Sequence, residues 1–98
     1  MEQPLTKPDA QKLIRRAAQR TDGVGFRGYA VMRMRQRRLD ALDVVRVLRN
    51  AVQAKPAYRR NEEWRYQISG RGLMIIVVIE SEEKVWVHNA YKPRTRTS

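Results

Sequence analysis

The sequence predicts an α+β fold in which N-terminal helices pack on one face of a three- to four-stranded antiparallel sheet. In the first half of the chain, apolar residues recur with the helical period of about 3.6, and after residue 57 they recur with the period of about 2 that is typical of strands. Helices followed by strands that short turns connect are typical of α+β proteins. The chain has 98 residues, enough for one domain, which we assign to residues 1–92.

The first predicted helix begins after Thr6 and ends before Gly23. Thr6 can serve as the N-cap with Asp9 three residues later, and Pro8 falls in the first turn, where its missing N–H costs little. Apolar side chains follow with the spacing of one buried stripe, at Ala10, Leu13, Ile14, Ala17 and Ala18. We expect residues 24–28 to form a short connector.

Two more helices are predicted before the strands begin. One covers about residues 29–37 and is crowded with arginines, whose mutual repulsion a bound anion would relieve. The alternative for this segment is an ordinary solvated charged face. The other helix covers about residues 41–54, with Asp40 as its N-cap and Pro56 as its stop.

Four strands are predicted in the second half of the chain. Turns at 61–63 and 81–84 and a glycine-containing hairpin turn at 69–72 separate them. The expected strands are residues 57–60, 64–68, the unbroken apolar run 73–79, and 85–92. Residues 93–98 are expected to form a basic, flexible tail.

The charge balance narrows the classes of function. Lys and Arg total 21 against 10 Asp and Glu, so the formal net charge is +11, which points to a polyanionic partner such as nucleic acid or an acidic protein. Arg outnumbers Lys, which GC-rich coding would also produce. The chain has no Cys and a single His, so neither a thiolate zinc site nor a His-rich metal cluster is expected, and no cofactor is expected. No segment has the length and apolarity of a membrane helix or a secretory signal, so we expect a cytoplasmic protein without membrane contact.

Alternation along the strands sorts their side chains between two faces of the sheet. One set should face the helices: Trp64, Tyr66, Ile68, Val85 and Val87. The other set should lie on an open face: Arg65, Gln67, Trp86, His88 and Lys92. A β-bulge near the end of the last strand would switch the face of residues 89–92.

The composition of this open face suits RNA. Cations neutralise phosphate, Trp86 offers a stacking surface, and Gln67 can form hydrogen bonds with a base edge. The face also suits metal-free RNA cleavage, in which the ribose 2′-OH attacks its own phosphate. His88 could fill either proton role, and Arg65 and Lys92 could hold the phosphate. The alternatives are a surface histidine, a solvated arginine and a tryptophan that a partner protein covers.

Residues 28–92 resemble a small prokaryotic family of unknown function. The segment from Gly28 to Val44 is similar to that family's S/T-x-H-A-x-x-R-M-x-x-R-x-I-x-x-x-D-V opening. Residues 64–70, WRYQISG, resemble its W-R-Y-x-I/V-x-G segment. The apolar strand 73–79 and the ending 89–92, NAYK, complete the resemblance. The layout is similar to RelE-like toxins of type II toxin–antitoxin systems, and the extra N-terminal helix is similar to MqsR-type mRNA interferases.

This resemblance implies a RelE-like sheet and a toxin that cuts mRNA without metal and that an antitoxin protein neutralises. Carried over by position, Arg33 and Arg37 match the family's helix arginines, and Arg65, Tyr91 and Lys92 match its polar strand positions. The family's helix histidine is replaced here by Tyr29, so any role of that histidine is lost or has passed to Tyr29 or His88. The candidate catalytic residues are therefore His88, Arg65, Lys92 and Tyr91.

Nucleic-acid binding is assigned to a wider set of residues: Arg33, Arg37, Arg59, Arg60, Gln67, Arg71 and Trp86. The expected partners are RNA, either free or on the ribosome, and a cognate antitoxin. Two alternatives remain open at this stage: a non-catalytic module that binds RNA or DNA, and a basic domain that binds an acidic protein.

Overall fold

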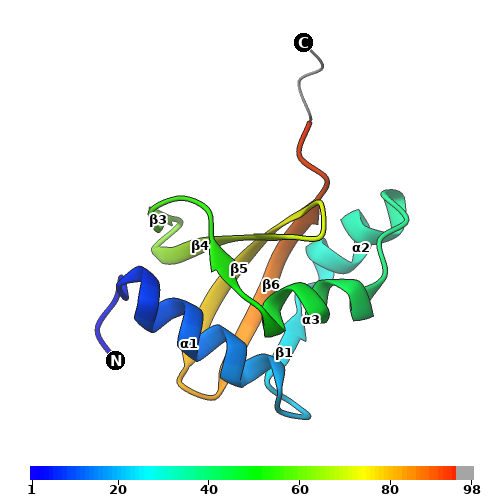
Figure 1. Ribbon diagram of the computed structural model, residues 1–98. Coiled ribbons are helices and arrows are strands. Elements are labelled where there is room, and N and C mark those ends of the chain that lie inside the picture. The colour runs from blue at the N-terminus through cyan, green and yellow to red at the C-terminus, as the bar shows by residue number, and fades with distance from the viewer. Residues whose placement is uncertain (95–98) are drawn as a thin grey trace.

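The computed structural model describes residues 1–94, and its three helices begin close to the predicted positions. They are α1 (Lys7–Ala18), α2 (Gly28–Gln36) and α3 (Ala41–Arg49) (Figure 1). The Thr6 hydroxyl accepts a hydrogen bond from the N–H of Asp9 at 3.3 Å, which confirms the predicted cap of α1. The Asp40 carboxylate caps α3 by accepting from the N–H of Leu42 at 2.9 Å. Residues 95–98 of the predicted tail lie outside the described part of the chain.

Six strands form one mixed sheet, so the α+β class is confirmed but the sheet differs from the predicted one. The strands are β1 (Val24–Phe26), β2 (Val52–Gln53), β3 (Tyr58–Arg60), β4 (Glu63–Gly70), β5 (Leu73–Ser81) and β6 (Lys84–Tyr91). Their order is β1-β6-β5-β4-β2, and β3 pairs with the other end of β4. β4, β5 and β6 form the predicted antiparallel meander. β1 pairs with β6 in parallel, which makes the sheet mixed.

Two of the predicted boundaries are wrong for one physical reason. Residues 24–26 are strand β1 rather than a connector, and the third helix stops at Arg49 instead of reaching about residue 54. Val52 and Gln53 leave the helix to pair with β4, and the N–H of Gln53 donates to the side chain of Gln11 on α1 at 2.8 Å. A strand of two or three residues is too short to show a hydrophobic period. It is defined instead by its pairing with a strand that is distant in the chain.

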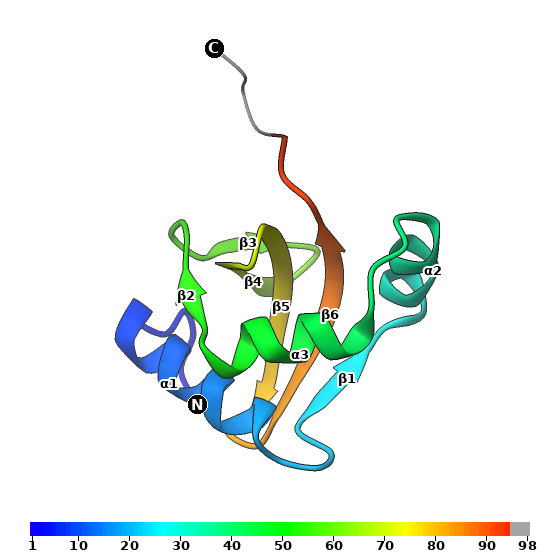
Figure 2. The same cartoon turned by 45° about the vertical axis from the view of Figure 1, so that its right-hand side comes forward.

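The helices divide into a covering pair and an edge helix. Figures 1 and 2 show α1 and α3 lying across one face of the sheet, while α2 lies beside β6 at the edge that β1 occupies. The core between α1, α3 and the sheet includes Ile14, Leu48, Tyr66, Ile75 and Val87, all fully buried. Because two helices cover only one face, the other face is available for a ligand.

The two hairpins of the meander have the turns that the sequence predicts. Arg71 and Gly72 join β4 to β5 with positive φ angles of 50° and 75°, a conformation that a two-residue hairpin loop favours and that glycine adopts without strain. Within residues 1–94, no helix combines the length and the apolarity that a membrane crossing requires.

Candidate nucleic-acid interface

A β-bulge at His88 decides which side chains of β6 reach the open face. Ile76 of β5 pairs with Asn89, but the next residue, Val77, pairs with Val87, so His88 is the extra residue. Beyond the bulge the alternation is shifted by one residue. Ala90 is buried against the core, and Tyr91 and Asn89 lie on the open face.

This bulge corrects the placement of Lys92. Uniform alternation would have put Lys92 on the same face as His88. Because of the shift, position 92 no longer falls on that face. Lys92 is exposed beyond the end of β6, and it does not line the hollow that contains the other candidate catalytic residues. His88 and Arg65 lie together there on one face as the alternation predicts, and the bulge adds Tyr91, which uniform alternation would have put on the helix-facing side.

These three residues lie in a hollow of about 530 Å³ on the open face, which we call the basic hollow. Side chains from α2, β3, the β3–β4 turn, β4, β5 and β6 line it: Tyr29, Tyr58, Arg60, Asn61, Arg65, Gln67, Ile76, His88, Asn89 and Tyr91. Cations, amides and tyrosines make up nearly all of this set. None of these lining residues is acidic, so the local charge favours an anion.

Arg65 is the most unusual residue of the basic hollow. Its side chain is only 8% exposed, and its Nε atom is buried without a hydrogen-bond partner among the described residues. The nearest carboxylate, that of Glu63, lies 3.9 Å from Nη2, too far for a hydrogen bond. A buried charge that is incompletely hydrogen-bonded is costly, and an anion in the hollow would offset part of that cost by its opposite charge.

His88 lies beside Arg65 in a cationic environment. Burial lowers the pKa of its imidazole from the ordinary 6.5, and the positive charges of Arg65 and Arg27 lower it further, against a weaker opposing effect of Glu63. The lowered pKa favours the neutral imidazole at pH 7. The ring of Tyr29 stacks on it, with centroids 5.8 Å apart.

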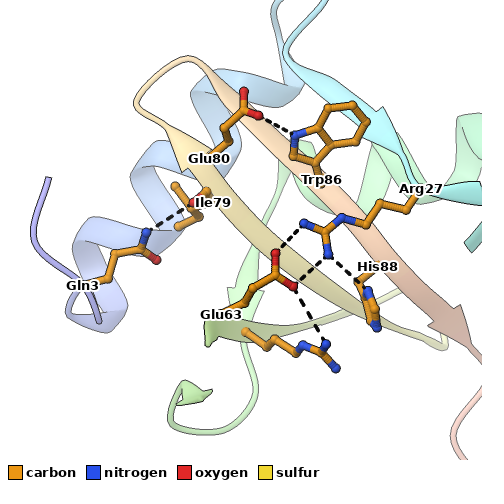
Figure 3. Close-up of polar contacts among 8 residues, drawn as sticks. Gln3, Arg27, Glu63, Ile79, Glu80, Trp86 and His88 are labelled. Carbon is orange, nitrogen blue, oxygen red and sulfur yellow. Dashed lines mark hydrogen bonds and ion pairs between the residues drawn. The ribbon is translucent and has the colours of Figure 1, made fainter. Parts of the chain in front are cut away.

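A bidentate ion pair borders the basic hollow. Arg27, just before α2, donates from Nη1 and Nη2 to the two carboxylate oxygens of Glu63 at 2.8 and 2.6 Å. Nη1 also lies 3.5 Å from Nδ1 of His88. Figure 3 shows this pair between His88 and Trp86. The bonds from Arg27 hold the pKa of the Glu63 carboxyl below its usual 4.5.

Trp86 lies on the open face as predicted, but it lines a separate hollow of about 290 Å³ beyond the Arg27–Glu63 pair. Its indole N–H donates to Glu80 at 3.2 Å, and the ammonium of Lys84 lies 4.8 Å from the ring centre. The ring also packs on Gly25, where an added Cβ would approach it to 2.5 Å. These contacts reduce the ring surface that a base could stack on.

The remaining predicted binding residues divide into two groups. Arg60 and Gln67 line the basic hollow, whereas Arg59 and Arg71 are exposed outside it. Arg33 and Arg37 are also outside the hollow, but each guanidinium lies 5.8 Å from the ring centre of a tyrosine that lines it, Tyr29 and Tyr91 respectively.

Arg37 has a further structural role. Its Nη1 donates at 2.8 Å both to the Asn89 side chain and to the carbonyl of Ala90, so it holds the strand directly after the bulge. This arginine therefore fixes Asn89, which lines the basic hollow, without lining the hollow itself.

Sequence reasoning missed Arg27, Glu63 and Tyr58. Arg27 falls in a segment that we expected to be a connector, and Glu63 in a segment that we expected to be a turn, so no period marked either of them. Tyr58 could have been found, because it alternates with Arg59 in a predicted strand and so shares a face with Arg60. Among residues 1–94, no three or more His, Asp or Glu side chains gather as a metal site would require.

Comparisons with protein-family models, with curated proteins and with solved structures find no match to this chain.

Proposed function

We propose that the protein is an endoribonuclease that cleaves single-stranded RNA without a metal ion, and that the basic hollow binds the scissile phosphate. The observation that supports it most directly is Arg65, a buried guanidinium whose Nε has no hydrogen-bond partner among the described residues. Its ion-pair partner among the described residues is Glu63 at 3.9 Å, and a phosphodiester oxygen in the hollow would place a second negative charge beside this guanidinium. Arg60 on the rim adds a second positive charge.

Tyrosines and amides around the cations favour RNA over a simple anion. Tyr58 and Tyr91 offer rings on which unpaired bases can stack, and Gln67 and Asn89 offer both donors and acceptors for base edges. Base edges and faces are exposed in this way in single strands, whereas duplex RNA hides them. The proposed substrate is therefore unpaired RNA such as mRNA.

The proposed reaction is transesterification within the RNA strand. The 2′-oxygen attacks phosphorus and loses its proton, the P–O5′ bond breaks, and the leaving 5′-oxygen gains a proton, which gives a 2′,3′-cyclic phosphate and a 5′-hydroxyl end. Arg65 would stabilise the extra negative charge on the phosphorane. His88 and the Tyr91 hydroxyl line the same hollow and are the groups assigned to the proton transfers.

The biological setting is part of the same proposal. The resemblance of residues 28–92 to RelE-like and MqsR-type toxins supports a cytoplasmic toxin with a RelE-like fold, which acts on free or ribosome-bound mRNA. An antitoxin would neutralise it by covering the basic face. The three-stranded meander with helices on one face and a basic open face is compatible with this assignment.

Cleavage of a matched pair of oligonucleotides tests the proposal. Purified protein in EDTA should cut a single-stranded oligoribonucleotide to cyclic-phosphate ends and leave the same sequence as DNA intact, because DNA lacks the 2′-OH. Arg65→Gln should abolish cleavage. Arg16→Gln, the same change at an exposed position of α1 on the covered side of the sheet, should leave cleavage unchanged.

The other outcomes correspond to the alternative functions. Salt-dependent binding of RNA or DNA, with no cleavage of RNA whether ribosomes are present or absent, would identify a non-catalytic nucleic-acid-binding module. No binding of either nucleic acid would favour a domain that binds an acidic protein. Controlled expression in a bacterial host should arrest growth if the toxin assignment is right, and Arg65→Gln should relieve the arrest.

A further inference from the structure

The contact between Arg27 and His88 constrains the protons of the imidazole ring. Nη1 of Arg27 carries two N–H groups; one donates to Glu63 at 2.8 Å, and the atom lies 3.5 Å from Nδ1 of His88 (Figure 3). A guanidinium has donors only. A proton on Nδ1 would therefore face another N–H, whereas an unprotonated Nδ1 accepts a hydrogen bond.

Glu63 prevents Arg27 from turning away from the ring. Its two carboxylate oxygens hold both terminal nitrogens of Arg27, at 2.8 and 2.6 Å, so the guanidinium plane is fixed at two points. The backbone N–H of Arg27 also donates to the carbonyl of Val87, directly before His88, at 3.1 Å. Both ends of Arg27 are thus fixed relative to the imidazole.

We infer that Arg27, anchored by Glu63, is a positioning residue that holds His88 as the neutral tautomer with its proton on Nε2. Besides Arg27, the charged groups that affect the ring are Arg65, Arg60 and Glu63, of which Glu63 alone favours a second proton. Arg65 and Arg60 are cations that also disfavour a second proton, and Tyr29 contacts the ring by its face rather than through a ring nitrogen.

The tautomer selects between the two proton roles of His88, and this step rests on the proposed function. An Nε2 atom that already carries a proton cannot take the proton of a ribose 2′-OH. It can donate a hydrogen bond to a phosphate oxygen or to the leaving 5′-oxygen, where negative charge develops. His88 is then a neutral hydrogen-bond donor that acts together with Arg65 rather than the general base. The proton of the 2′-OH passes to solvent water, and the leaving 5′-oxygen takes its proton from water.

Nitrogen-15 NMR of the ligand-free protein tests the tautomer directly. His88 is the only histidine of the chain, so one pair of imidazole nitrogens gives all the signals. At pH 7.5, a pH chosen so that the ring is neutral, Nε2 should show the shift of an N–H nitrogen and Nδ1 the shift of a bare nitrogen. The reverse pattern, or an even mixture of tautomers, would overturn the inference.

Two variants that each break the Arg27–Glu63 ion pair show whether Arg27 positions the His88 imidazole or only supports the local structure. Arg27→Gln should raise the pKa of His88 and weaken its tautomer preference, because it removes a nearby cation and the fixed donor. Glu63→Gln should lower the pKa of His88, because it removes the nearby anion and leaves the cation. A purely structural role would shift the pKa in the same direction in both variants, which would contradict the inference.

A remote carboxylate provides the matched control. Glu83 pairs with Arg20 at 3.6 Å on the exposed β5–β6 turn, so Glu83→Gln should leave the imidazole signals unchanged. Because none of these measurements uses RNA, they can fail while cleavage is observed, and they can succeed while cleavage is absent. The test therefore distinguishes failure of this inference from failure of the proposed function.

Discussion

The ring of Tyr29 at the start of α2 stacks on the imidazole of His88 in β6, with centroids 5.8 Å apart and planes inclined by 30°. Arg27, two residues earlier, contacts the same imidazole at Nδ1. Residues 27–29 therefore contact the His88 imidazole twice, at Nδ1 through Arg27 and at the ring face through Tyr29. The aromatic residue at the start of α2 and the histidine of β6 are therefore neighbours in this fold.

Replacing the stacked ring should change the titration of His88. Burial is the largest cause of its lowered pKa, so Tyr29→Ala, which uncovers the imidazole, should raise that pKa towards 6.5. Tyr29→Phe keeps the stacking and should leave the pKa close to that of the wild type. Proton NMR of the single histidine measures both values. An unchanged pKa in Tyr29→Ala would contradict the proposed role of this contact in burying the ring.

The sequence placed part of the site correctly because strand alternation is a local property. Arg65, Gln67 and His88 were assigned to the open face from the period of 2 alone, and all three line the basic hollow. Lys92 was misplaced because a single extra residue at His88 shifts every position that follows. Alternation leaves a bulge in the last strand open as an alternative, but nothing local in residues 85–92 decides whether it forms.

Other features depend on contacts between segments that are distant in the chain. Glu63 follows a turn in which Asn61 and Glu62 have positive φ angles, and its partner Arg27 lies 36 residues earlier. No period or motif links two such positions. The strands β1 and β2 escape prediction for the same reason, since each is defined by a partner at least 15 residues away.

The stability of the fold should decrease between pH 7 and pH 5.5 because of His88. Its folded pKa lies below the ordinary 6.5, so the unfolded chain binds the proton more tightly. The stabilisation is complete above about pH 6.5 and is lost as the pH falls towards the folded pKa, by at most about 1.4 kcal/mol per pH unit. Urea unfolding at a series of pH values should show this slope, and His88→Asn should flatten it. Equal slopes in the two proteins would contradict the prediction.

Arg37→Ala should destabilise the fold through the bulge. The substitution removes two hydrogen bonds of 2.8 Å, to Asn89 and to the carbonyl of Ala90, and we expect a loss of about 1–3 kcal/mol. Arg35→Ala, on the exposed side of α2, is the control and should change the free energy of unfolding by less than about 0.5 kcal/mol. Chemical denaturation measures both values, and similar losses in the two variants would argue against the bulge as the cause.

Two glycine substitutions should have opposite effects. An added Cβ at Gly25 would lie 2.5 Å from the ring of Trp86, so Gly25→Ala should displace the indole and cost about 1–3 kcal/mol. At Gly28, the first residue of α2, an added Cβ meets no atom within 4 Å, so Gly28→Ala should stabilise by about 0.4–1 kcal/mol. Thermal unfolding together with tryptophan fluorescence measures both effects. A Gly25→Ala protein with unchanged stability and emission would contradict the packing of Trp86 on β1.

Arg65→Met should separate stability from RNA binding. Methionine fills similar space without a charge, and replacing a buried, poorly paired guanidinium should leave the free energy of unfolding unchanged or raise it by about 1–2 kcal/mol. The same substitution should weaken RNA binding about tenfold or more, because a charge-assisted hydrogen bond contributes about 1.5–3 kcal/mol. The slope of log affinity against log salt should fall by about 0.7, the contribution of one phosphate contact on a single strand.

The combination of these two effects identifies the role of Arg65. Replacing a core residue by one that fits less well lowers the free energy of unfolding. Replacing a charged residue at the rim by an uncharged one leaves the free energy of unfolding almost unchanged and weakens RNA binding only slightly. Only a buried charge kept for a ligand gives equal or higher stability together with a large loss of binding. Reduced stability with unchanged RNA affinity would show that Arg65 serves the fold through Glu63 rather than an RNA phosphate.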